Sequence, residues 1–231
     1  MINKYPAHRT VSALLLCALA ACSTTPMTKQ STAQPPASSA NLSGAATLPG
    51  TPAPVPVALD AKTSALLILD INSAVCQPNP ACTGTVPAIA SLLGKARAAN
   101  VPVIYSTNLN PAGPPATLAA VAPQPGESVV AARGNKFTGT NLEDTLKQQN
   151  VGTLVIVGTA ANGAVMYTSF HANTRGFTVV VAEDGISSAA PVNTRLAQYQ
   201  LLNQPGFINS DNTPLADKKV TLSRGDLITF R

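Results

Sequence analysis

Residues 153–185, TLVIVGTAANGAVMYTSFHANTRGFTVVVAEDG, contain the pattern that decides the fold of this chain. The apolar, β-branched run Leu154–Val157 is typical of a strand that is buried on both faces. The sequence TAANG then predicts a turn in which Asn162 caps a helix, and Gly176 ends that helix in a left-handed conformation. A second buried strand follows at residues 177–182. Strand, helix and strand within about thirty residues predict a right-handed parallel βαβ unit.

The turn between the first strand and the helix is where we expect a ligand. In open parallel sheets, ligands bind beyond the carboxyl ends of the strands. A helix N-terminus at that edge also presents backbone N–H groups that suit an anion or an oxyanion. The turn is rich in small residues, which are Gly158, Ala160, Ala161, Gly163 and Ala164. Small residues serve close approach of a ligand and tight strand–helix packing equally well, so this stretch alone leaves both interpretations open.

The rest of the domain alternates apolar strands with amphipathic helices. Beside the central unit, strands are predicted at residues 65–70, where ALLILD ends in Asp70, at residues 101–106 and 128–131, and near the chain end in KKVTLSRGDLITF. Helices are predicted at residues 86–99, from a capping box at Thr140–Glu143 to Gln149, and from Pro191 with Leu196, Tyr199 and Leu202 on the core side. Loops are predicted at residues 71–84 and at the Pro-rich residues 108–127. A long loop such as the Pro-rich one often covers a pocket.

The first residues predict export. Lys4 and Arg9 form a positive region, and residues 11–20 form an apolar run too short to span a bilayer. The segment that ends in Cys22 resembles the lipobox of bacterial lipoproteins. This resemblance implies a signal peptide at residues 1–21 and lipidation of Cys22. Because Ser rather than Asp follows Cys22, it also implies the outer membrane of a Gram-negative bacterium, with the domain facing the periplasm.

Residues 22–58 predict a disordered tether between this lipid anchor and a domain at residues 59–231. The tether is rich in Ser, Thr, Ala and Pro, and such a composition buries too little apolar surface to fold. The whole chain of 231 residues carries a net charge of +5, and removal of the first 21 residues would leave +3. Basic runs with interleaved aromatic residues are missing from the sequence, so we do not expect nucleic acid as a partner.

The cysteines and histidines narrow the chemistry of the exported domain. Cys76 and Cys82 have five residues between them, and an oxidising compartment favours a disulfide between them. Zinc is the alternative, but the mature chain has one histidine, His171, and zinc needs more ligands. Because His171 lies about two turns into its helix, we interpret it as a surface or packing residue. No metal or cofactor is therefore expected.

Four motifs together resemble the isochorismatase-like hydrolases, also called the cysteine hydrolase family. They are ALLILD, FTGTNLEDTL at residues 137–146, TLVIVGTAANGAV and GFTVVVAEDGISS, and they span residues 65–188. The resemblance implies an α/β fold of three αβα layers, Rossmann-like, with a six-stranded, mostly parallel sheet. It also implies a homo-oligomer, and a cis peptide bond between Ala160 and Ala161.

The catalytic set that the resemblance implies is incomplete in this chain. The acid/base position falls on Asp70, the nucleophilic cysteine falls on Ala164, and the threonine before it falls on Ala161, which would face the substrate. Counting back from Phe137 places the family lysine on Ala131, beside Ala132. Two cations lie nearby out of register: Lys136 as the replacement for the catalytic lysine and Arg133 as a substrate-binding residue.

These replacements lead to two hypotheses. An alanine cannot be activated as a thiolate can, so thiol-dependent amidase activity is not expected. The first hypothesis is therefore a pseudoenzyme that binds a small ligand or a partner. The second is a hydrolase that uses Asp70 and a nearby cation, because some members of the family hydrolyse a vinyl ether by proton delivery without the cysteine.

Overall fold

The computed structural model describes residues 50–231, and the predicted signal peptide, Cys22 and most of the predicted tether lie outside the described residues. Within them, a sheet of six parallel strands has the order β4-β3-β2-β5-β6-β7. The strands are β2 (Ser64–Leu69), β3 (Val103–Thr107), β4 (Ser128–Ala131), β5 (Thr153–Thr159), β6 (Thr178–Ser187) and β7 (Val220–Ser223). Two short strands, β1 (Val57–Leu59) and β8 (Ile228–Phe230), form a separate parallel pair.

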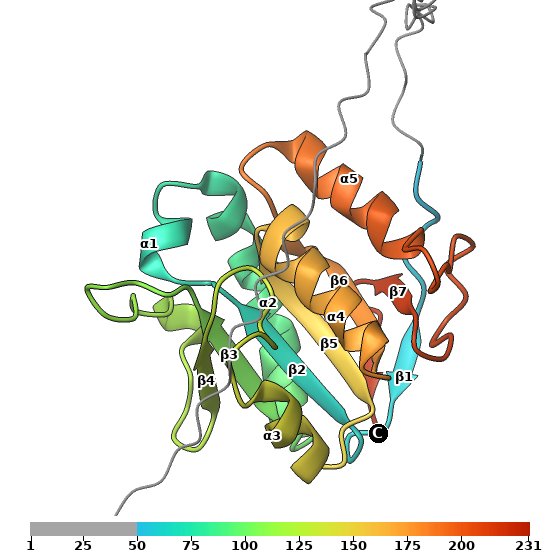
Figure 1. Ribbon diagram of the computed structural model, residues 1–231, viewed down its shortest axis with the longest axis horizontal. Helices are drawn as coiled ribbons and strands as arrows, with labels where there is room; N and C mark the ends of the chain where they lie inside the picture. Colours follow the sequence, from blue (N-terminus) through green and yellow to red (C-terminus); the bar gives the residue numbers. More distant parts are fainter. Residues whose placement is uncertain (1–49) are drawn as a thin grey trace, which may run out of the picture. The chain divides into compact units, whose positions relative to one another are not determined.

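Helices cover both faces of the sheet, which confirms the predicted three-layer α/β fold (Figure 1). Helix α2 (Pro80–Ala98) packs on one face, and α3 (Leu142–Gln148), α4 (Met166–Thr174) and α5 (Pro191–Leu202) pack on the other. Alternate residues of β2 serve the two layers: Leu66 and Ile68 face the α2 side, while Leu67 and Leu69 face the α3/α4 side. A strand covered on both faces has no polar side, and this explains the continuous apolar runs in the sequence.

The central βαβ unit is confirmed, but its turn differs from the prediction. The helix begins through a π-helical turn, η2 (Ala161–Val165), that has no side-chain cap. Asn162 is therefore not a cap, and its side-chain oxygen instead accepts a hydrogen bond of 2.8 Å from the Ser188 hydroxyl. Gly176 has a φ of 89° after α4, as predicted for the end of that helix.

Strand β6 and the cis peptide bond also correct the prediction for this unit. Strand β6 runs to Ser187, because pairing with β5 resumes after an irregularity, with Thr159 opposite Ser187. The cis bond lies between Thr159 and Ala160, so the expected position between Ala160 and Ala161 is wrong by one residue. The helical segment also starts earlier than predicted: Ala160 and not Asn162 is its N-cap residue, and the Ala160 carbonyl accepts the N–H groups of Gly163 and Val165.

The segment after β2 is helical where the sequence predicted a loop. A short helix, α1 (Ser73–Cys76), follows Asn72, whose side chain accepts the N–H of Val75 at 3.1 Å. Helix α2 then begins at Pro80, six residues before the predicted start. Asn79 caps α2 and Pro80 occupies its first turn, where the missing N–H of proline is harmless. The loop was predicted from these prolines and asparagines, but both residue types also favour the start of a helix.

Two further helix predictions fail in detail. The predicted capping box at Thr140–Glu143 does not form: α3 starts after Asn141, and Glu143 pairs with Lys147 and Arg175. Helix α5 starts at Pro191 as predicted and buries Leu202, but its buried face also uses Ala197 and Leu201. Leu196, expected on the core side, is 36% exposed.

The ordered domain extends beyond the predicted start at residue 59. Val57 is buried and pairs with Ile228, and the Val55 N–H donates to the Leu222 carbonyl at 3.1 Å. The end of the predicted tether thus packs against the last strands of the domain. Across residues 50–231, none of the helices is long and apolar enough to cross a membrane.

Candidate active site at the strand ends

Asp70 ends β2 beside the turn that follows β5, as predicted. Its neighbour Leu69 pairs with Gly158, and the Asp70 N–H donates to the Ser106 carbonyl of β3 at 3.1 Å. Asp70 has a φ of 57°, so the extended backbone stops here. Gly158 has a φ of 136°, and a Cβ at this position would collide with the carbonyl oxygen of Leu69. The close approach of the two strand ends therefore requires glycine at position 158.

A buried ion pair joins Asp70 to Lys136. The Lys136 ammonium nitrogen lies 2.8 Å from Asp70 Oδ2 and 3.0 Å from the Ala132 carbonyl oxygen. The Ser106 hydroxyl donates to Asp70 Oδ1 at 2.8 Å. Lys136 is 0% exposed and Asp70 is 7% exposed. Burying either charge alone is costly, and the pairing and hydrogen bonds offset that cost.

The cation that faces Asp70 is therefore Lys136, although the lysine is out of register in the sequence. The positions reached by counting, Ala131 and Ala132, are backbone neighbours of the pair, and Ala132 contributes its carbonyl oxygen. A lysine four residues later can take this place because its side chain is long and the loop returns to the strand ends. The lysine that contacts Asp70 therefore lies four residues after Ala132 in the sequence.

Helix α4 holds the loop that carries Lys136. The backbone N–H of Lys136 donates to the Thr168 hydroxyl at 3.2 Å. The ring of Tyr167 lies against Gly134, where an added Cβ would come within 2.8 Å of it. Arg133, in the same loop, is exposed and forms no side-chain hydrogen bond or ion pair with other residues in the range 50–231. The structure thus brings Lys136 to Asp70 and leaves Arg133 at the surface.

Ala164, to which the resemblance assigns the nucleophile position, carries a methyl group. Ala164 is 5% exposed and Ala161 is 0% exposed, and both belong to the core on the α3/α4 side of the sheet, where the Lys136 backbone contacts Thr168 of α4. Thr168 lies one helical turn after Ala164, so the two share a face of the helix and link this position to the Lys136 loop. Asn162 and Ser188 tie the turn to the end of β6.

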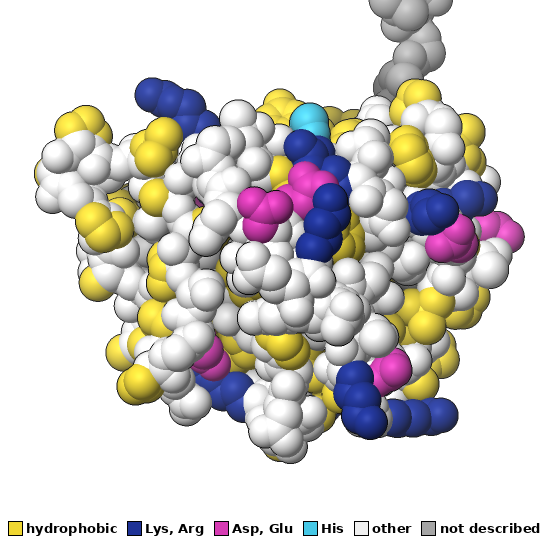
Figure 2. All heavy atoms as spheres, turned by 60° about the horizontal axis from the view of Figure 1, so that its bottom comes forward, with side chains coloured by type: hydrophobic (Ala, Val, Ile, Leu, Met, Phe, Trp, Pro, Cys, Tyr) yellow, Lys and Arg dark blue, Asp and Glu magenta, His cyan; other side chains and the backbone are white. Residues whose placement is uncertain are grey.

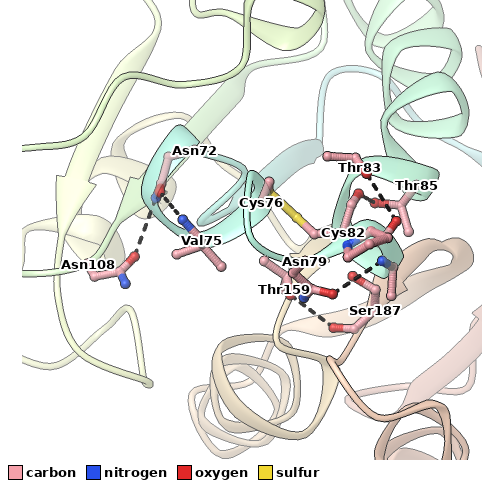
Figure 3. Close-up of a disulfide and its surroundings, with 12 residues drawn as sticks. Asn72, Val75, Cys76, Asn79, Cys82, Thr83, Thr85, Asn108, Thr159 and Ser187 are labelled. Carbon is pink, nitrogen blue, oxygen red and sulfur yellow. Dashed lines mark hydrogen bonds between the residues drawn. A yellow bond between two sulfur atoms is a disulfide. The ribbon is translucent and has the colours of Figure 1, made fainter.

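The predicted disulfide between Cys76 and Cys82 is confirmed, with an S–S distance of 2.05 Å and a Cα–Cα distance of 5.0 Å (Figure 3). Both cysteines are buried. The bridge joins the end of α1 to the first turn of α2, instead of lying in a loop. It therefore fixes the segment that directly follows Asp70, and it leaves no free thiol among the described residues.

The Pro-rich loop at residues 108–127 packs against that same segment. Asn72 forms an isolated antiparallel bridge with Thr117, and the Ser73 N–H donates to the Ala116 carbonyl at 2.9 Å. Asn72 also donates a long hydrogen bond of 3.4 Å to Asn108 at the start of the loop (Figure 3). These contacts place the loop against the segment that directly follows Asp70.

An ion pair anchors the far end of this loop to α2. Arg97 donates to both carboxylate oxygens of Glu127 at 2.8 Å and to the Ala122 carbonyl at 2.9 Å. Burial tends to raise the pKa of Glu127, but the hydrogen bonds from Arg97 and from the Gln124 N–H outweigh it and hold that pKa below its usual range. Burial raises the pKa of the Tyr105 hydroxyl, which accepts a further bond from Arg97.

Charged side chains of α3 and its neighbour α4 form a cluster around a histidine, and Figure 2 shows acidic and basic side chains next to a histidine on one face of the molecule. Glu143 pairs with Lys147 and Arg175, and Arg175 Nη1 lies 3.2 Å from His171 Nδ1. Arg175 also stacks over the Phe137 ring, 4.9 Å from its centroid. His171 is exposed, which confirms its interpretation as a surface residue. Within residues 50–231, no cluster of three or more His, Cys, Asp or Glu side chains could hold a metal ion.

Two hollows of the described surface lie elsewhere. One, of about 400 Å³, is lined by Arg97 and Glu127 at the amino ends of β3 and β4. The other, of about 530 Å³, lies between α2 and β8. Neither is lined by Asp70 or Lys136. We place the candidate site at the strand ends because the buried charge pair, and not the size of a hollow, identifies the chemistry.

The hydroxyl residues of this edge were not predicted from the sequence. Ser106 contacts Asp70 directly, and Thr107 follows it at the end of β3. Thr159 and Ser187 end β5 and β6 at the same edge. Their positions directly after apolar runs were a usable signal, but Ser and Thr are too common in strands and turns for that signal to be specific.

A family model described as an isochorismatase domain matches residues 64–208. The secreted isochorismatase effector Isc1 of Verticillium dahliae is 35% identical over 130 residues, which cover 48% of this chain and 68% of that protein. N-carbamoylsarcosine amidase of an Arthrobacter species is 28% identical over 181 residues, which cover 64% of this chain and 69% of the amidase.

Solved structures with the same fold include an isochorismatase family protein from Desulfovibrio vulgaris, with a TM-score of 0.62 and 24% identity. That match covers 71% of this chain and 95% of the other. A cysteine hydrolase from Pseudomonas syringae pv. phaseolicola gives a TM-score of 0.62 at 19% identity, and the match covers 77% of this chain and 94% of the hydrolase. At these identities the similarity supports the fold.

Proposed function

Because the chain belongs to the isochorismatase family, we propose that it is a member that binds a small ligand at the Asp70–Lys136 pair and has lost thiol-dependent hydrolysis. The observation that carries this proposal is the combination of an intact buried ion pair with a methyl group at the nucleophile position, Ala164. Amide hydrolysis by a thiolate requires a sulfur that Ala164 does not have.

The buried pair supports a role in binding because it is a poor device for stability alone. Replacing both members of a buried ion pair by apolar residues of similar volume is often neutral or stabilising. A leucine and a methionine at positions 70 and 136 would therefore stabilise the fold about as well as Asp70 and Lys136 do. The charged pair differs in that it provides a hydrogen-bond acceptor and a cation at the edge where ligands bind.

A thermal-shift screen of small carboxylates, amides and ureido compounds, repeated with the same compounds as an activity screen, tests this function. We expect at least one compound to raise the melting temperature without being consumed. The matched variant is Asp70→Asn, which keeps the shape of the side chain and removes its charge. It should abolish the shift. Turnover of any stabilising amide by the unmodified chain would contradict the proposal.

A second candidate function is hydrolysis that needs no thiol, and the 2.8 Å contact between Lys136 and Asp70 favours it. In vinyl-ether hydrolysis, a proton adds to the terminal carbon, water adds to the resulting oxocarbenium carbon, and the hemiketal releases a ketone and an alcohol. Asp70 would transfer the proton, and Lys136 would stabilise the negative charge that Asp70 carries after the transfer. Release of a keto acid from a vinyl-ether substrate, lost in Asp70→Asn, would establish this function.

Export and lipid anchoring are part of the proposal. The positive region, apolar run and lipobox that end in Cys22 support them, as does the disulfide at Cys76, which suits an oxidising compartment. We propose an outer-membrane lipoprotein that faces the periplasm. Incorporation of labelled palmitate in a Gram-negative host, followed by membrane fractionation, tests this, and Cys22→Ser should abolish the label. Light scattering of the purified chain tests the proposed homo-oligomer.

A further inference from the structure

Residues at one level form a row across the carboxyl ends of the four central strands. The row consists of Thr107 of β3, Asp70 after β2, Thr159 of β5 and Ser187 of β6. The sheet register places them side by side: Leu69 is opposite both Ser106 and Gly158, so the next residues along these three strands are adjacent, and Thr159 is opposite Ser187. With strands about 4.8 Å apart, the row spans roughly 14 Å.

The three hydroxyl residues of the row face the α2 side of the sheet. Tyr105 belongs to the core on that side, so the alternation of strand residues directs Thr107 there as well. Ile186 belongs to the opposite core, which directs Ser187 to the α2 side. In Figure 3, Thr159 and Ser187 lie next to the start of α2 and the disulfide.

Two of these hydroxyls are buried without a partner. The side-chain oxygens of Thr107 and Ser187 have no hydrogen-bond partner within residues 50–231, although the residues are only 5% and 4% exposed. The third hydroxyl, of Thr159, donates to the Ser187 carbonyl at 3.1 Å. An unpartnered buried hydroxyl disfavours the folded state. Two of them in one row, at the edge where ligands bind, point to a hydrogen-bonding ligand.

We propose that this row is a binding subsite for a neutral ligand portion that carries hydroxyl or amide groups. Hydroxyls both donate and accept, which suits such groups. None of the four row residues carries a positive charge, and Asp70 is acidic, so the row disfavours an anion. The subsite rests on the proposed function of the site, because it extends the Asp70–Lys136 edge to the α2 side of the strand ends.

Acetamide and glycerol are the probes for a test by NMR. Each is titrated into the ¹⁵N-labelled full chain while the backbone amide signals of the row are followed. We expect saturable shifts at Thr107, Thr159 and Ser187. Thr107→Val and Ser187→Ala should weaken the affinity about two- to tenfold, the range for loss of one hydrogen bond. Both variants should keep or raise the melting temperature, because each removes an unpartnered hydroxyl.

Thr221→Val is the matched control. Thr221 is also buried, but its hydroxyl accepts the Leu215 N–H at 3.0 Å and donates to the Thr213 carbonyl at 3.3 Å. The control should lower the melting temperature and leave probe affinity unchanged. If Thr107→Val and Ser187→Ala behave like this control, the two hydroxyls have a structural role and the subsite is overturned.

The pattern of shifts separates failure of the subsite from failure of the proposed function. Saturable shifts at Lys136 and Ala164 without shifts in the row overturn the subsite and leave the proposed ligand site standing. The absence of saturable shifts at both places, with either probe, overturns the subsite and counts against the proposed site as well.

Discussion

Replacing Lys136 by methionine should destabilise the domain strongly, because Asp70 would keep its charge in a nearly closed environment. Lys136 is 0% exposed and its nitrogen lies 2.8 Å from Asp70 Oδ2, so the variant removes the counter-charge and leaves one hydrogen bond, from Ser106. Breaking a buried pair in this way costs about 3–5 kcal/mol. For a domain of this size each kcal/mol lowers the melting temperature by about 2–4 °C, so we expect a decrease of roughly 6–20 °C.

The double variant Asp70→Leu/Lys136→Met decides whether this loss comes from the unpaired charge. Without either charge, the desolvation penalty disappears and the stability should return to near that of the unmodified protein or exceed it. Urea unfolding of both single variants and the double variant gives the coupling free energy.

Lys147→Met is the control for loss of a lysine, since Lys147 lies at the surface in a pair with Glu143. It should leave the urea midpoint nearly unchanged. If Lys136→Met costs no more than Lys147→Met, the pair is not buried in solution and the reasoning about the site fails.

Three further outcomes are expected. Ala164→Cys places a thiol in the turn η2 just before α4, the helix that contacts the Lys136 loop, and a nearby cation favours the thiolate. Iodoacetamide should therefore modify it faster than free cysteine near neutral pH, and equal rates would show that the Asp70–Lys136 pair does not reach this position. The pKa of Glu127 is lowered in the folded state, so its contribution to stability is present above its unfolded pKa of about 4.3 and is lost as the pH falls through the folded value. The difference in urea midpoint between the unmodified chain and Glu127→Gln should therefore shrink as the pH falls from 7 towards roughly 3, and a constant difference would contradict the role of Arg97. Thiol titration of the unreduced mature protein should find no reactive thiol, and two would disprove the bridge between the cysteines of the domain.

Local pattern predicted the strands well and the helix starts poorly. The strands predicted from the apolar runs at residues 65–69 and 154–157 were correct, because a strand buried on both faces needs an apolar side chain at nearly every position. The starts of helices depend on single polar side chains with several partners available. Thr140 and Asn162 were predicted as caps, yet Thr140 donates to the Lys136 carbonyl and Asn162 accepts from Ser188. The first partner is only four residues away along the chain, whereas the second comes from the end of β6, so a cap motif read from residue types alone cannot tell which contact forms.

Residue type and spacing over short stretches of the sequence were enough to predict the parallel βαβ unit, the position of Asp70 at a strand end and the pairing of Cys76 with Cys82. The resemblance of four motifs to a known family added the three-layer fold and the assignment of the nucleophile position to Ala164. Only the tertiary structure decided which cation faces Asp70 and which hydroxyls share its edge. The reach of Lys136 depends on the path of its loop, which α4 holds through Thr168, and the row of hydroxyls depends on the register of four strands that are distant in sequence. Both arise from long-range packing, and counting residues along the chain cannot supply that information.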